Sequence, residues 1–167
     1  ALGMGIICCE LGLDFKIFGD PAIDPQLEMI LKQLGGDVHL SKNPNFPGAY
    51  QSLRLAALNN FLLSNPSAYW TQQYDNLNSA NAYSIIAEQL LNTLATHFHL
   101  VGTIGSGGST CGIIQNLRKV NQNIKLYGVD TFNSVLFGQP NGQRLLRGLG
   151  NTIMPKNLKH QLFDEIH

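Results

Sequence analysis

The chain has 167 residues, of which 44% are hydrophobic and 13% charged, and its formal net charge at pH 7 is zero. Such a length suits one large domain or two small ones. The lack of excess positive charge argues against nucleic-acid binding, which requires a basic face. No apolar run approaches the roughly 20 residues of a membrane-spanning helix, and the three cysteines, two of them adjacent, indicate reduced thiols in a cytoplasmic protein.

Helices and strands alternate along the first half of the chain. Apolar periodicity and turn residues predict a helix over 1–11, a strand over 14–19, a helix from Asp24-Pro25 to residue 34 and a strand over 37–40. A loop over 42–48 and a helix over 49–63 follow. Residues 69–74 carry β-type side chains and predict another strand, and the polar stretch 75–81 predicts a loop that caps the next helix.

The second half continues the alternation. The pattern predicts a helix over 83–94, a strand over 98–104, a helix that ends at Lys119, a strand over 124–130 and a short final helix over 158–166. Between the last two, residues 131–150 are rich in glycine and proline and predict a functional loop region. This order predicts an α/β fold in which a parallel sheet carries helices on both faces.

The most informative stretch lies between the strand over 98–104 and the helix after it. The strand leads into the loop Gly105-Ser106-Gly107-Gly108-Ser109-Thr110, and an amphipathic helix begins at once. Glycines let backbone amides converge, and a helix N-terminus adds partial positive charge, so such a loop binds anions well. Because the loop contains no Lys or Arg, neutral amides and hydroxyls would hold the anion.

Several ligands are compatible with this loop. A nucleoside triphosphate is disfavoured because Ile113 stands where the Walker pattern has lysine. A dinucleotide stays open: Gly105 and Gly107 begin its fingerprint and Asp130 stands about where a ribose-binding acid would, although Thr110 occupies the third glycine position. A single phosphate monoester fits best, and a glycine-rich turn that binds nothing is the remaining alternative.

Other chemistry-bearing residues are better explained by packing. His97 and His99 would share one side of a strand, but a zinc site needs three or four ligands and no further candidate stands near. His39 has no neighbour that suggests metal binding or catalysis. Cys111 lies one turn into the helix and fits a buried packing thiol better than a reactive one. We therefore expect no metal site.

Four segments carry a resemblance to a known family, and their order and spacing fit it from about Ala1 to about Leu158. They are Gly105-Ser106-Gly107-Gly108-Ser109, Gln72-Gln73-Tyr74-Asp75-Asn76, residues 124–130 followed by Ser134-Val135-Leu136, and Gly148-Leu149-Gly150 with Ile153-Met154-Pro155. Together they resemble cysteine synthase (O-acetylserine sulfhydrylase) and, more broadly, pyridoxal-phosphate enzymes of the tryptophan-synthase β type. The stretch 134–150 also resembles the subgroup that joins phosphoserine-type substrates to amino-acid nucleophiles.

The resemblance implies a fold-type II pyridoxal-phosphate enzyme, with part of an incomplete small domain over 1–80 and part of the large cofactor-binding domain over 81–167. It implies that pyridoxal 5'-phosphate is held by Gly105, Ser106, Gly107, Gly108, Ser109 and Gly148. Gln73 would bind the carboxylate of a small amino-acid substrate. The implied reaction is β-replacement, which makes cysteine or a related amino acid from an activated serine such as O-acetylserine or O-phosphoserine.

The family's Schiff-base lysine lies upstream of the segment that matches Ala1, and none of the seven lysines of this chain stands at that position. We therefore expect a fragment without a catalytic residue, inactive alone, which forms a homodimer or associates with the rest of the enzyme. A non-catalytic binding module derived from the family and a nucleotide-binding Rossmann-like domain remain as alternatives.

Overall fold

The structure of the chain divides into two units. It is a computed structural model that describes residues 1–41, 50–94, 97–146 and 148–167, and its internal contacts group Ala1–Tyr69 and Trp70–His167. The sequence places a boundary after residue 80, and the assignment of a small domain to 1–80 and of a large one to 81–167 stays a prediction. The loop predicted over 42–48 lies outside the described residues.

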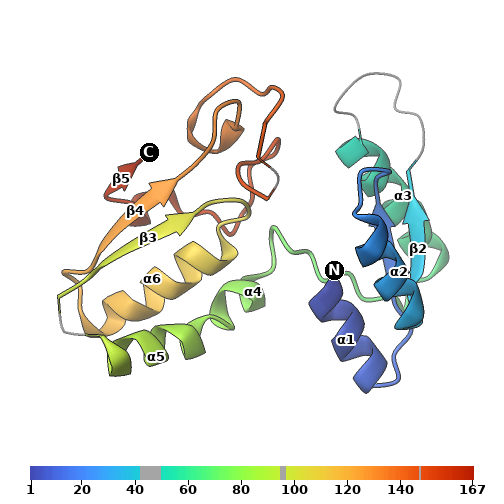
Figure 1. The fold of residues 1–167 in the computed structure, drawn as a ribbon, viewed down its shortest axis with the longest axis horizontal. Coiled ribbons are helices and arrows are strands. Elements are labelled where there is room, and N and C mark those ends of the chain that lie inside the picture. Colours follow the sequence, from blue (N-terminus) through green and yellow to red (C-terminus); the bar gives the residue numbers. More distant parts are fainter. Residues whose placement is uncertain (42–49, 95–96, 147) are drawn as a thin grey trace. The chain divides into compact units, whose positions relative to one another are not determined.

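The first unit is built on a parallel strand–helix–strand motif (Figure 1). Strand β1 (Lys16–Gly19) pairs in parallel with β2 (Asp37–Leu40), and α2 (Pro25–Gln33) connects them. The unit also contains α1 (Leu2–Glu10) and α3 (Tyr50–Ser64). Each of these elements lies where the sequence predicts it.

Helix α2 begins at a residue that caps it. One carboxylate oxygen of Asp24 accepts hydrogen bonds from the backbone amides of Gln26 at 2.8 Å and Leu27 at 3.1 Å. A cap of this kind satisfies amides that have no partner inside the helix. The helix therefore supplies its own negative charge at the end whose dipole attracts it.

The second unit holds a parallel sheet in the order β3-β4-β5. The strands are β3 (His99–Thr103), β4 (Lys125–Val129) and β5 (Glu165–Ile166), and α6 (Gly108–Val120) connects β3 to β4. The unit also has α4 (Leu77–Asn81), α5 (Ser84–Thr93) and the 3-10 turns η1 (Val135–Phe137) and η2 (His160–Leu162). Figure 1 shows α5 and α6 side by side next to this sheet. The two sheets formed by the described residues are both parallel, as the alternation of elements predicts.

Two clusters of buried apolar side chains hold the second unit together, and α6 contributes to both. The first consists of Ala87, Ile114, Leu117, Ile124 and Leu126, and the second of Ile104, Cys111, Leu136 and Leu158. On α6, the buried positions follow helical spacing, so one face of the helix packs inward. Burial of each large aliphatic side chain stabilises the fold by about 1.5–3 kcal/mol.

Helices α4 and α6 approach each other closely because α6 has a glycine at the crossing. A Cβ built on Gly112 would lie 2.4 Å from the carbonyl oxygen of Ala80 and 3.0 Å from its Cα. No side chain fits in that space. The crossing holds α4, and the turn before it, against the first turns of α6.

The strand predicted over 69–74 is wrong. Gln72 has a φ of 48°, and its carbonyl oxygen accepts hydrogen bonds from the amides of Asp75 and Asn76, which closes a turn. The side chain of Asn76 then caps α4, a short helix where the sequence predicts a loop. The β-type side chains there favour a strand locally, but the backbone bonds of this turn override that preference.

The helix predicted over 158–166 is also wrong, because the C-terminal segment pairs with β4 instead. The Asp164 carboxylate anchors this pairing: it accepts a hydrogen bond from the amide of Leu126 at 2.8 Å and contacts Lys125 and Arg118. The backbone bond from Leu126, with the two cations, lowers the pKa of Asp164 to about 2. These contacts join the last turn of α6, β4 and the C-terminal segment.

Candidate functional site

A glycine-rich loop joins β3 to α6 at the carboxyl edge of the second sheet, where open α/β sheets bind their ligands. The amide of Ile104 bonds to the carbonyl oxygen of Val129 and ends the strand pairing. The chain then turns through Gly107, whose φ is 79°, and α6 begins at Gly108. The predicted order of strand, loop and helix is confirmed here.

The first turn of α6 leaves backbone amides unpaired. The N-cap position is Gly107, which has no side chain to close the helix. Within the described part of the chain, no acceptor receives a hydrogen bond from the amides of Gly107, Ser109 or Thr110, and that of Gly108 donates only to Ser106 Oγ, at 3.4 Å. Unpaired N–H groups at a helix N-terminus form a binding site for an anion.

The dipole of α6 contributes positive potential at this loop, which itself contains no Lys or Arg. Helix α6 has 13 residues, with no acidic residue in its first turn and with Arg118 and Lys119 in its last. Its macrodipole is equivalent to roughly half a positive charge at the loop. Ser109 is exposed and Ser106 half-buried, so neither residue is closed off from solvent at the loop.

The backbone of the loop is fixed from two sides. Gly107 is left-handed, and a Cβ on it would lie 2.7 Å from the Cα of Leu158, so no other residue fits without strain. Thr110 Oγ1 donates to the carbonyl oxygen of Thr103 at 2.9 Å. The same side chain covers Gly102, whose Cβ would lie only 2.5 Å from it.

A second glycine-rich segment lies beside the loop. The amide of Gly150 donates to the carbonyl oxygen of Ile104 at 2.8 Å, and Asn151 Nδ2 donates to that of Gly105 at 3.3 Å. A Cβ on Gly105 would meet the carbonyl oxygen of Gly148 at 3.1 Å. The structure thus brings Gly148 next to the loop.

Gln73 lies in the turn before α4, on a well-fixed backbone. The carbonyl oxygen of Gln72 accepts the amides of Asp75 and Asn76, both at 2.9 Å, and Asn76 Nδ2 donates to the carbonyl oxygen of Thr71 at 3.0 Å. The side chain of Gln73 itself is exposed. Gln73 therefore presents an exposed carboxamide from a turn, not from the end of a strand as the sequence predicts.

Asn157 connects this turn to the loop, and the sequence prediction missed it. Its side chain is 2% exposed, and its Nδ2 donates to the carbonyl oxygens of Gln73 at 3.1 Å and Asn76 at 3.2 Å. The same nitrogen lies 3.9 Å from the Cβ position of Gly108. Its partners in the turn precede it by 84 and 81 residues, so no local pattern marks the residue.

The other candidates from the sequence do not build a second site. His99 packs against the ring of Tyr127, with 5.5 Å between ring centroids, and burial raises the pKa of the Cys111 thiol. Within the described ranges, no three His, Cys, Asp or Glu side chains gather in a way that could hold a metal ion. No helix of these ranges is long and apolar enough to cross a membrane.

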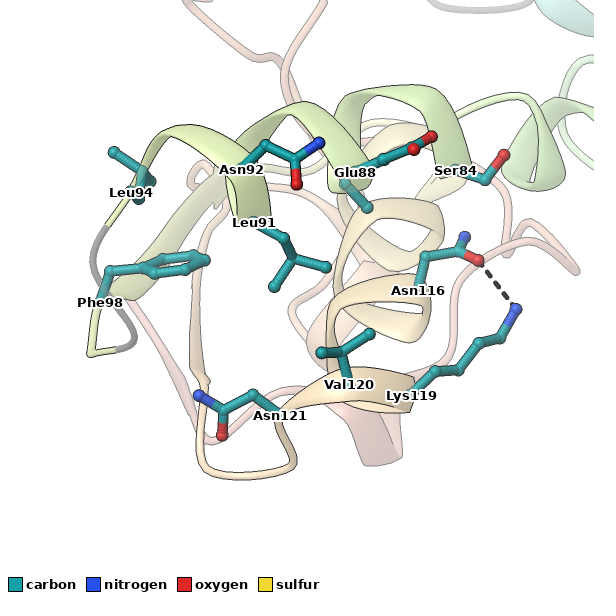
Figure 2. A pocket seen from close by; sticks show the side chains of 11 residues that line it. Ser84, Glu88, Leu91, Asn92, Leu94, Phe98, Asn116, Lys119, Val120 and Asn121 are labelled. Atoms are coloured by element: carbon teal, nitrogen blue, oxygen red, sulfur yellow. Dashed lines mark hydrogen bonds between the residues drawn. The ribbon is translucent and has the colours of Figure 1, made fainter.

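A hollow between α5 and α6 lies at the other end of α6 (Figure 2). Its volume is about 720 Å³, and the side chains of Leu91, Phe98 and Val120 help to line it. On its rim, Lys119 Nζ donates to Asn116 Oδ1 at 2.8 Å, so these two polar groups bond to each other. The opposite end of α6 offers unpaired donors, and the loop is therefore the candidate site.

Comparison with known families decides what kind of protein has this loop. The model of the family described as pyridoxal-phosphate dependent enzyme matches residues 1–167. The chain belongs to this family of pyridoxal-phosphate dependent enzymes. The resemblance inferred from the sequence is confirmed, and pyridoxal phosphate is the cofactor of the family.

Individual relatives and solved structures also resemble this chain over nearly its whole length. N-(2-amino-2-carboxyethyl)-L-glutamate synthase of Cupriavidus metallidurans is 33% identical over 168 residues, which cover 99% of this chain and 49% of the relative. Cysteine synthase of Entamoeba histolytica superposes with a TM-score of 0.88 at 21% identity, covering 99% of this chain and 48% of that one. The O-acetylserine dependent cystathionine beta-synthase of Helicobacter pylori gives 0.84 at 24% identity, covering 98% and 53%.

The two solved structures show the fold, which is that of fold-type II pyridoxal-phosphate enzymes: parallel sheets with helices packed against them. The chain spans about half the length of the relatives it matches.

The residues of the loop fit the phosphate of this cofactor. A phosphate ester carries several strong acceptor oxygens, and the unpaired amides of Gly107, Ser109 and Thr110 are donors at one helix end. Gly107 and Gly108 present no side chain, and the hydroxyls of Ser106 and Ser109 add further donors. The loop 105–110 itself contains no Lys or Arg, so the donors it offers are neutral.

Proposed function

We propose that the chain is the phosphate-binding part of an enzyme that performs β-replacement on an activated serine and makes cysteine or a related amino acid. The observation that carries this proposal is the set of unpaired amides at the N-terminus of α6. Membership of the pyridoxal-phosphate family supports it, because it names a phosphate ester that such amides suit.

The loop is proposed to hold the cofactor phosphate. The residues assigned to it are Gly105, Ser106, Gly107, Gly108 and Ser109, with Gly148 beside them. Gly148 has a φ of 79° and no atom within 4 Å of its Cβ position, which supports a place at an open border of the site. Pyridoxal phosphate, when bound, supplies an electron sink, and the protein supplies binding and orientation.

Gln73 is proposed to bind the α-carboxylate of the substrate. Its carboxamide nitrogen offers two donors, its side chain is exposed, and its carbonyl oxygen is held by Asn157. A fixed backbone with a free carboxamide suits the orientation of a carboxylate. No group of this chain is assigned a proton-transfer step.

The relatives support an activated serine, such as O-acetylserine or O-phosphoserine, as the substrate class. One solved structure is named for its dependence on O-acetylserine. Another relative is named for a 2-amino-2-carboxyethyl group on glutamate, which is the skeleton left when the glutamate nitrogen displaces the leaving group of an activated serine. We propose sulfide or an amino-acid nitrogen as the nucleophile.

We also propose that this chain does not complete the reaction alone. Five of the six lysines in the described ranges contact side chains other than the loop's: Lys16 with Asp37, Lys32 with Glu28, Lys119 with Asn116, Lys125 with Asp164 and Lys156 with Asp75. We expect the Schiff-base lysine to come from the rest of the enzyme. The chain would act in the cytoplasm, as a homodimer or in association with that remainder.

Isothermal titration calorimetry of the full chain with pyridoxal phosphate tests the proposal. We expect saturable binding for which inorganic phosphate competes, since the same amides hold both. NAD, titrated in parallel, should not bind. Binding of NAD without binding of pyridoxal phosphate would overturn the proposal in favour of a nucleotide-binding domain.

Borohydride reduction of the intact enzyme separates an enzyme from a silent binding module. An active family member should retain the cofactor covalently after reduction, on a lysine outside residues 1–167. Mass spectrometry of the digested protein locates the modified peptide. Cofactor that binds but is never trapped would favour the non-catalytic module.

A further inference from the structure

Asn157 is a buried polar side chain that the proposed ligand contacts leave without a role. It is 2% exposed, and its Oδ1 is buried with no hydrogen-bond partner among the described residues. A buried polar atom without a partner costs free energy. The Asn157 carboxamide therefore has an energetic cost at its oxygen, while its nitrogen makes two hydrogen bonds.

The segment around Asn157 binds the turn of Gln73 at consecutive residues. Asn157 Nδ2 donates to the carbonyl oxygens of Gln73 and Asn76, and the Asn157 amide donates to that of Tyr74 at 3.0 Å. Next to it, the amide of Lys156 donates to the Asp75 carboxylate at 3.0 Å. The turn from 73 to 76, which we call the glutamine turn, is thus tied to this segment at every residue.

The other side of the same segment supports the anion-binding loop. The Asn157 carbonyl oxygen lies 3.1 Å, and the Leu158 Cα 2.7 Å, from the Cβ position of Gly107. The side chain of Leu158 is buried in the cluster that includes Ile104 and Cys111. Asn157 therefore has the glutamine turn on one side and the N-terminus of α6 on the other.

We propose that Asn157 is a positioning residue that fixes the place of the glutamine turn relative to the loop. It touches neither ligand. It holds the group that receives the substrate carboxylate at a fixed separation from the amides that receive the cofactor phosphate. This inference rests on the proposed function, because it takes both of those assignments as given.

A residue that positions two ligand-binding groups relative to each other couples them energetically, whereas a residue that only fills space does not. If Asn157 couples the two sites, phosphate binding at the loop should restrain the glutamine turn. Replacement of the Asn157 carboxamide should abolish this coupling. If Asn157 serves only the packing, its replacement should lower stability and leave any such coupling in place.

Hydrogen–deuterium exchange at the amides of Asp75 and Asn76 measures this coupling, because both donate to the carbonyl oxygen of Gln72. The full chain is measured free and saturated with pyridoxal phosphate, as wild type and as Asn157→Ala. We expect the cofactor to slow exchange in the wild type by about tenfold, and by less than about twofold in the variant. Calorimetry on the same samples reports whether the cofactor binds.

Lys156→Ala is the matched control, since it removes the ion pair with Asp75 but keeps the backbone bond and the carboxamide of Asn157. It should retain the wild-type coupling. Should Asn157→Ala not fold, Asn157→Ser replaces it, with the same expected loss.

Coupling that persists without the carboxamide would overturn the inference, as would a wild type that binds the cofactor without any change at the turn. A wild type that binds no pyridoxal phosphate would instead refute the proposed function. In that case, exchange in the free state still tests whether Asn157 holds the glutamine turn. The amides of Asp75 and Asn76 should exchange faster in Asn157→Ala than in the wild type, and equal rates would refute the positioning role.

Discussion

Two strand–helix–strand motifs of the same parallel topology differ in whether the start of their helix is capped. At the start of α2, the Asp24 carboxylate accepts the amides of Gln26 and Leu27, and Glu28 adds a second acid in the first turn. Helix α6 starts at Gly107, with no side-chain cap and no acid in its first turn. Helix α2 carries its own anion, whereas the amides of Gly107, Ser109 and Thr110 at the start of α6 have no acceptor among the described residues. The comparison shows that the two helix starts differ in a few residues at the cap, and under the proposed function that difference makes the start of α6 a binding site.

The largest effect should follow from giving α6 an acid of its own. Ser109→Asp places a carboxylate in the first turn, where it competes for the unpaired amides and repels a phosphate dianion. We expect the affinity for pyridoxal phosphate to fall by about 100-fold, or roughly 2.8 kcal/mol. Calorimetric titration measures it, with the neutral Ser109→Asn as the control. Unchanged affinity in Ser109→Asp would count decisively against the loop.

The next largest effect should come from the backbone that keeps α6 open. Gly107→Ala must place a Cβ at a φ of 79° and 2.7 Å from the Cα of Leu158. We expect it to lower the free energy of unfolding by about 2 kcal/mol or more, as measured by urea denaturation. Gly138→Ala is the control, because its φ is 85° but nothing lies within 4 Å of its Cβ position. Equal costs at both sites would show that the contact with Leu158 does not matter.

Removing the cap of α2 should affect stability alone. Asp24→Ala leaves the amides of Gln26 and Leu27 without their acceptor, and we expect a loss of about 1 kcal/mol in the free energy of unfolding. The affinity for pyridoxal phosphate should not change. Asp14→Ala, at an exposed acid in the same unit, controls for the loss of charge. A loss of cofactor affinity in Asp24→Ala would mean that the two helix starts do not differ as described.

The smallest effect on stability should appear at the C-terminal end of α6, where Arg118 contacts Asp164. The folded-state pKa of Asp164 is lowered to about 2, against an ordinary value near 3.9. Its contribution to stability is therefore full above about pH 4 and disappears as the pH falls towards 2. Because the carboxylate is partly exposed, solvent weakens the effect.

Urea denaturation of wild type and Asp164→Asn at several pH values tests this pH dependence. The wild type should be the more stable at neutral pH, and the difference in unfolding free energy should shrink as the pH falls from about 4 to about 2. A difference that stays constant over this window would contradict the assignment of the low pKa to the contacts of Asp164.

Local signals in the sequence predict most of the elements and the loop. Asp24-Pro25 marks the start of α2, and the run Gly105–Ser109 marks the turn from β3 into α6, because capping and left-handed turns depend on residues within a few positions. The four segments that resemble the family add an expected order of the motifs. A glycine-rich turn between a strand and a helix can therefore be located from the residues within it and beside it.

The errors and omissions concern contacts between residues far apart in the sequence. Residues 69–74 have strand-forming side chains, yet a turn forms there that is tied to the segment around Asn157. The helix predicted over 158–166 loses to pairing with β4, which depends on Asp164 reaching Leu126. Asn157 itself was missed because its partners lie on another part of the chain. Local propensity cannot report such bonds.

Amide NMR of the ¹⁵N-labelled full chain during titration with pyridoxal phosphate tests the contrast between the two helix starts most directly. We predict that the amide signals of Gly107, Ser109 and Thr110 shift together and saturate, while those of Gln26 and Leu27 stay in place. Binding that leaves the three loop amides unshifted, or that moves only residues around the hollow between α5 and α6, would contradict the account.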